Sequence, residues 1–112
     1  MAGRNQTLKQ AIDALNSNGY FLTAASIAIS DSSDLNNYKT PGRYLCVNSA
    51  KAKTLQNCPV EVGFTLRVEI MGADWIRQIL DVAASASIIQ WQRILSPATN
   101  TWSNWVSFSF IN

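Results

Sequence analysis

The sequence predicts a mainly β protein of the α+β class. A short N-terminal helix over residues 1–19 is followed by a small antiparallel β-meander or sandwich-like knob over residues 20–112. The first supporting observation is that the spacing of apolar residues changes from about 3.6 to about 2 after Gly19. The second is the length of 112 residues, which fits one domain. The third is composition: apolar residues make up 47% and charged residues only 14%, so amides and hydroxyls cover much of the surface.

The predicted helix begins at a capping box, in which Thr7 is the cap and Gln10 stands three residues on. Gly19 is a suitable stop. One apolar stripe runs along the helix: Leu8, Ile12 and Leu15. So short a helix is unstable alone and must pack on something. The stripe matches about one and a half heptads of a coiled coil, which favours an oligomer seam or anchor. The alternative is packing on the sheet of its own domain.

Alternating apolar and polar residues predict the strands. Their ranges are 20–30, 43–47, 63–71, 75–82, 87–95 and 105–111. The strand over 63–71 has the cleanest alternation. Residues 75–82 fit either a helix or a strand, and the short hairpin loop at Gly72 favours a strand. In the last strand, Val106, Phe108 and Phe110 are expected to face inward, and Ser107 and Ser109 outward.

Turn residues separate these strands. Residues 31–37 and 96–100 are rich in Asp, Ser, Asn and Thr, which favour turns, and residues 48–59 form a polar loop. Residues 40–43 predict a type II turn, because Pro41 fixes φ at its second position and Gly42 supplies a positive φ at its third.

The chain has two cysteines, Cys46 and Cys58, and no histidine. Two thiols alone cannot complete a tetrahedral zinc site, so no metal and no cofactor is expected. The cysteines form either a disulfide or two buried thiols that pack as small apolar groups. In both cases we expect them to lie close together, because the loop between them leaves one strand and returns to the next.

The residue inventory argues against catalysis. Without histidine, the commonest general base and the Ser-His and Cys-His arrangements are absent. The five glycines are isolated, so no phosphate loop is predicted. A net charge of +2 does not predict nucleic-acid binding. No apolar run reaches the roughly 20 residues of a membrane span, and residues 1–10 lack the apolar core of a signal peptide.

Binding is the better hypothesis. Four tryptophans stand in a chain rich in asparagine and glutamine, and aromatic rings beside amides make good recognition surfaces. Arg93 is expected to stack on Trp91, and Arg77 on Trp75. The alternative is that most rings fill the core or an interface. The residues expected to contact a ligand are Tyr38, Arg43, Lys51, Lys53 and Trp91.

Several motifs resemble those of one family. Residues 34–36 are Asp-Leu-Asn and residues 40–44 are Thr-Pro-Gly-Arg-Tyr. They resemble the opening "DLN…TPGxY" of pyocin-knob-type modules in phage and prophage tail fibres. Residues 52–59 are similar to an "A-T-L-x-N-C-P" loop of such modules. Residues 102–105 are similar to their closing "W-x-x-W" turn, although Thr101 stands where many members have glycine. The resemblance spans about residues 34–108.

Such modules sit on trimeric fibres that contact the host surface. The resemblance therefore implies a homotrimer in the phage particle, made in the bacterial cytoplasm, with other virion proteins and a bacterial surface glycan as partners. It also implies that Trp102 and Trp105 clamp the last hairpin. The alternative is a purely structural virion component, such as a capsid-attached head fibre or a decoration protein.

Overall fold

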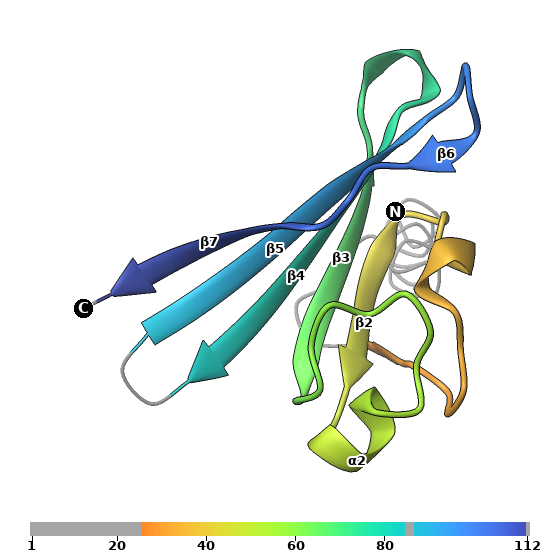
Figure 1. Cartoon of the computed structure of the whole chain (residues 1–112). Coiled ribbons are helices and arrows are strands. Elements are labelled where there is room, and N and C mark those ends of the chain that lie inside the picture. The colour runs from red at the N-terminus through yellow and green to blue at the C-terminus, as the bar shows by residue number, and fades with distance from the viewer. Residues whose placement is uncertain (1–25, 85–86, 112) are drawn as a thin grey trace, which may run out of the picture.

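A computed structural model describes residues 26–84 and 87–111 (Figure 1). The strands are β1 (Ile27–Ala28), β2 (Gly42–Cys46), β3 (Phe64–Ile70), β4 (Ile76–Ala84), β5 (Ser87–Ser96), β6 (Thr101–Trp102) and β7 (Val106–Ile111). The helical turns are η1 (Leu35–Asn37), α2 (Ser49–Ala52) and η2 (Gly72–Asp74). The strands form one sheet in the order β1-β2-β3-β4-β5-β6, and β7 pairs with β5 next to β6. The protein is therefore mainly β.

The five predicted strands from residue 43 onward are confirmed as β2, β3, β4, β5 and β7, including the ambiguous segment 75–82. All the pairs from β2 onward are antiparallel. The predicted all-antiparallel meander is nevertheless wrong at one edge, because β1 runs parallel to β2. A parallel neighbour needs a crossover connection, and residues 29–41 supply it.

Two parts of the predicted fold lie outside the described residues. They are the helix over residues 1–19 and the start of the strand over 20–30. The proposed oligomer seam of Leu8, Ile12 and Leu15 belongs to this part of the chain.

The strand register defines two faces of the sheet, because directly paired residues point to the same side. The core face carries the buried apolar residues of the central strands, among them Leu66 and Leu80, which are paired. A loop layer, residues 29–38 and 48–60, covers this face and contributes Ile29, Leu35 and Ala52 to the core. Figure 1 shows these segments beside β2 and β3. In the described residues the core is thus closed by loops and not by the second sheet of a sandwich.

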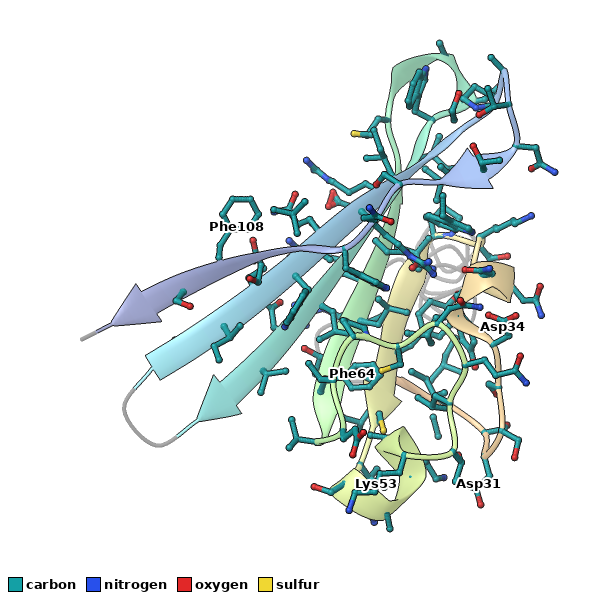
Figure 2. The ribbon with its side chains drawn as sticks, in the orientation of Figure 1. Asp31, Asp34, Lys53, Phe64 and Phe108 are labelled. Carbon is teal, nitrogen blue, oxygen red and sulfur yellow. The ribbon has the colours of Figure 1, made fainter. Side chains whose placement is uncertain are left out.

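The prediction of which β7 side chains face the core is wrong. Phe108 is 45% exposed and Val106 54% exposed, and both lie on the outer face, opposite the core face. Ser107 is the residue on the core-face side, paired with Trp91. Figure 2 shows Phe108 far from the loop layer, whereas Phe64 lies beneath it. The reason is that β7 pairs with β5 on the side away from β4. The loop layer does not extend over this part of the sheet, so no apolar side chain of β7 is needed on the core face.

The turn at residues 40–43 also differs from the prediction. No backbone hydrogen bond of the described residues joins Thr40 to Arg43, and Gly42 has a φ of 159° as the first residue of β2. The Thr40 carbonyl instead accepts a hydrogen bond from the Tyr44 hydroxyl at 2.7 Å. The segment is therefore a bend fixed by a side chain. Two short elements, α2 and β6, were not predicted.

Candidate functional site

The residues that the sequence suggested for ligand contact do not form one surface. Tyr38 and Trp91 are half-buried and pack against the core cluster. The Tyr38 ring meets the Tyr44 ring edge-on, with 4.9 Å between the ring centroids. The Trp91 Nε1 is buried and has no hydrogen-bond partner within the described part of the chain. Both rings therefore contribute to packing.

The three cationic candidates lie elsewhere. Arg43 is exposed and pairs with Arg67, on the outer face of the sheet. Lys51 lies on α2, 3.7 Å from Asp31, and Lys53 is the exposed residue at the end of that helix (Figure 2). The register places Arg43 on the side of the sheet opposite Trp91, so these five residues cannot contact one small ligand together.

The structure instead gathers polar and aromatic groups around Arg93, in an arrangement that we call the Arg93 clamp: Arg93, Trp102 and Trp105. The Arg93 Cζ lies 4.2 Å from the ring centroid of Trp102 and 4.5 Å from that of Trp105. The sequence-based pairing of Arg93 with Trp91 is therefore wrong. Arg77 makes an ion pair with Glu69 at 3.3 Å in place of the expected stack on Trp75.

Arg93 is 5% exposed, and neutral groups hold its guanidinium. Its Nε donates to the Gln78 Oε1 at 2.8 Å, and its Nη1 donates to the Asn36 Oδ1 at 2.9 Å. Burial lowers the pKa of Arg93 to about 10, against the opposing attraction of Asp34. Because this pKa is still well above 7, the group is a buried cation at neutral pH. The amide oxygens and ring faces offset part of its desolvation, while its Nη2 is buried without a hydrogen-bond partner among the described residues.

The clamp also ties the loop layer to the sheet. Gln78 pairs directly with Arg93, and its Nε2 donates to the carbonyls of Leu35 and Tyr38 at 2.7 and 2.9 Å. The indole of Trp102 donates to the Asn36 carbonyl at 3.3 Å, and that of Trp105 to the Asn57 carbonyl at 3.0 Å. The resemblance implied that Trp102 and Trp105 clamp the last hairpin. Their hydrogen bonds to Asn36 and Asn57 attach the loop layer as well.

Asp34 holds together the two loop segments that bind the indoles, at Asn36 and Asn57. Its Oδ1 accepts hydrogen bonds from the Asn57 Nδ2 at 2.7 Å and from the Asn36 backbone N–H at 2.9 Å. These two bonds, with the attraction of Arg93, hold the pKa of Asp34 below its ordinary value. Asn57 has a φ of 57°, which asparagine tolerates better than most residues. The Asp34-Leu35-Asn36 motif and Asn57 therefore meet at one place in the fold.

A cleft of about 430 Å³ lies beside the Arg93 clamp, and we call it the amide cleft. Besides the three clamp residues, its lining is neutral and polar: Asn36, Asn57, Asn100, Thr101, Ser103 and Asn104. These side chains donate and accept hydrogen bonds but offer no general base and no strong nucleophile. The cleft is therefore suited to binding polar groups.

Most of this cleft was not predicted from the sequence. The two tryptophans of the closing turn were predicted, but no role was expected for Asn100 or Asn104. Asn36 was noted only as part of a motif. A usable signal was the run of small polar residues around a W-x-x-W pair, directly after a turn.

The two cysteines are unbonded in the structure. Cys46 is buried in the core cluster and Cys58 packs against it. Burial raises the pKa of both thiols. The described residues contain no group of three or more metal-ligating side chains. None of the helical segments among these residues could span a lipid bilayer.

The described chain is thus a mainly β module, with one mixed sheet and a loop layer on one face. No family model matches the sequence, and no curated protein matches it. A solved structure with a similar fold is the tail fibre of Staphylococcus aureus phage P68, with a TM-score of 0.58 and 19% sequence identity. The match covers 80% of this chain and 20% of that chain. It shows a fold that also occurs within a phage tail fibre.

Proposed function

We propose that this protein is a module of a phage or prophage fibre, that it acts as a homotrimer in the virion, and that it attaches the particle to a glycan of the host surface. The observation that carries the proposal is the fold shared with a phage tail fibre. The motifs at residues 34–46 and 102–105, which resemble pyocin-knob-type modules, support it independently, because they converge on the Arg93 clamp in the structure.

Binding, and not catalysis, is the proposed activity. The chain has no histidine, and the cleft beside the Arg93 clamp is lined by amides, hydroxyls and indoles. Such a lining supports recognition of a hydroxyl-rich ligand.

Self-association is supported by the outer face of the sheet. Ile88, Val106 and Phe108 are each between 45% and 54% exposed there, on paired strands. The described residues of one chain leave these apolar side chains exposed, and a second copy would remove them from water. We also propose the stripe of Leu8, Ile12 and Leu15 as a seam, so Ile12→Asp is expected to weaken the trimer by placing a charge in it.

The second candidate is a purely structural virion component, such as a head fibre or decoration protein on the capsid. It is favoured by the use of Trp102 and Trp105 to hold the fold together. In that case the aromatic residues serve packing alone.

Binding of the labelled, full-length protein to an array of bacterial surface oligosaccharides separates the two. The attachment proposal predicts retention on a defined subset of glycans that is lost when the protein is unfolded. Absence of retention on every glycan by a folded trimer would favour the structural role.

A further inference from the structure

We propose that the amide cleft is the saccharide-binding site of this module and that it selects neutral sugars. This inference rests on the proposed attachment function and gives it a location. The location differs from the ligand contacts expected from the sequence, because none of those five residues lines the cleft.

Two amide side chains of the cleft, those of Asn36 and Asn57, are oriented in advance by their hydrogen bonds. Arg93 can only donate, so the Asn36 Oδ1 must face it and the Asn36 Nδ2 is turned away. The Asp34 carboxylate only accepts, so the Asn57 Nδ2 faces it and the Asn57 Oδ1 is turned away. Because both residues line the cleft, Asn36 can offer a ligand an amide donor and Asn57 an amide acceptor, which match the two capacities of a sugar hydroxyl.

The remaining polar lining is held in place by hydrogen bonds that also use the hydroxyls of Thr101 and Ser103, and no hydrogen bond of the described residues uses the side-chain amides of Asn100 and Asn104. The segment carrying it is anchored to β5, because Ser103 N–H donates to the Ile94 carbonyl at 2.8 Å and Ile94 N–H donates to the Ser103 Oγ at 3.0 Å. Asn100 has a φ of 52° and its N–H donates to the Ser96 carbonyl at 2.8 Å. Preorganised groups lose little entropy on binding.

The two indoles of the cleft contribute apolar surface. Their N–H groups are already bonded to the carbonyls of Asn36 and Asn57, so the rings of Trp102 and Trp105 can offer a ligand only apolar surface. Flat aromatic surface beside amides suits the apolar C–H face of a sugar ring.

Charge also bears on the choice of ligand. Among the described residues that line the cleft, Arg93 alone is charged; its guanidinium is 5% exposed and stacked on both rings, and its Nη2 is buried without a hydrogen-bond partner in this part of the chain. An anionic ligand would lose hydration without direct contact with this buried cation, and a cationic ligand would be repelled by it. The surface that a ligand can touch is therefore neutral.

The test uses the four tryptophans as internal reporters. The indole N–H signals of the 15N-labelled, full-length protein are assigned, and glucose, galactose, N-acetylglucosamine and the charged glucuronic acid are each titrated to millimolar concentration. The expected result is that a neutral sugar shifts the signals of Trp102 and Trp105 and leaves those of Trp75 and Trp91 in place. Shifts confined to Trp75 or Trp91, shifts with glucuronic acid alone, or no shift with any of the four sugars would overturn the inference.

Variants locate the site without disturbing the Arg93 clamp. Asn100→Gly removes the amide and still permits the positive φ, and Asn104→Ala removes a second exposed amide. Since each of the two lost hydrogen bonds contributes about 1 kcal/mol, the double variant should bind the shifting sugar about thirtyfold more weakly. Asn37→Ala, an exposed amide outside the cleft, is the matched control and should bind as wild type does.

The glycan array separates this inference from the proposed function. If the wild type is retained on glycans and the Asn100→Gly/Asn104→Ala variant is retained equally, attachment stands and the cleft assignment is wrong. If neutral sugars shift Trp102 and Trp105 but no glycan retains the protein, the cleft stands and the attachment role is wrong.

Discussion

Arg93 is the residue at which β5, η1 and the last hairpin meet. Replacing it by methionine keeps most of the apolar length but leaves the Gln78 Oε1 and Asn36 Oδ1 without their donor and removes the cation from both indoles. We expect Arg93→Met to lower the free energy of unfolding by about 2–4 kcal/mol, because each buried group left unpaired costs about 1–3 kcal/mol.

Urea denaturation at one fixed protein concentration measures this change. Arg43→Met is the control, since Arg43 is exposed on the outer face, and it should stay within about 0.5 kcal/mol of wild type. Equal losses in the two variants would mean that the Arg93 clamp does not hold the loop layer to the sheet.

Asp34 makes the same region sensitive to acid. Hydrogen bonds from Asn57 and the Asn36 N–H lower the pKa of this carboxyl from its ordinary value of 3.8 in the folded state. A carboxyl whose folded pKa is depressed contributes stability that is fully present above the unfolded value and is lost as pH falls through the folded one. We therefore expect part of the stability to disappear below about pH 4.

Asp34→Asn keeps an oxygen that can accept both hydrogen bonds but cannot titrate. Its free energy of unfolding should fall less than that of wild type between pH 7 and pH 3, as followed by urea denaturation at each pH. Asp74→Asn, at an exposed position in η2, should keep the wild-type acid profile. An acid profile of Asp34→Asn identical to that of wild type would contradict the role of this carboxylate.

Among the predicted strands, β3 was the most predictable from sequence, whereas the facing of the side chains along β7 was predicted wrongly. Alternation along β3 reports local geometry, and Leu66 and Val68 are buried as expected. Alternation along β7 defines two faces as well, but it cannot say which face is covered. That depends on the loop layer, whose contacts join residues far apart in the sequence.

Non-local pairing explains the other errors too. The parallel pairing of β1 with β2 depends on the crossover of residues 29–41, which no local pattern encodes. Arg93 and Trp91 are adjacent on one face of β5, so sequence reasoning paired them. The actual partners of Arg93 come from the chain after the next turn. The amide cleft was missed for the same reason, because its walls come from residues near 36, 57 and 100–105.

The outer face of β7 supports a prediction at the scale of the element. Phe108→Ser removes an exposed apolar ring on the strand that ends the sheet, so it should leave the β content unchanged by circular dichroism. If this face lies between copies, the variant should dissociate at higher concentration in sedimentation velocity. Val62→Ser, which removes an exposed apolar residue of the loop before β3, should sediment as wild type does. Identical association of Phe108→Ser and wild type would place the interface elsewhere.

At the scale of the whole molecule, the main hydrophobic cluster of residues 26–84 and 87–111 lies on one face of the sheet. Among these residues, Ile88, Val106 and Phe108 are exposed on the other face. A chain of 112 residues buries a modest core, and association is one way for a small domain to bury more. Three copies would also repeat the amide cleft three times, so weak contacts to a repeating surface glycan would add up through avidity.

Sedimentation equilibrium of the full-length protein at micromolar concentration tests the proposed fibre module most directly. A fibre module is expected to associate with itself, so we predict a single species with about three times the 12.3 kDa mass of the chain. A stable monomer across that concentration range would contradict the trimeric fibre module that we propose.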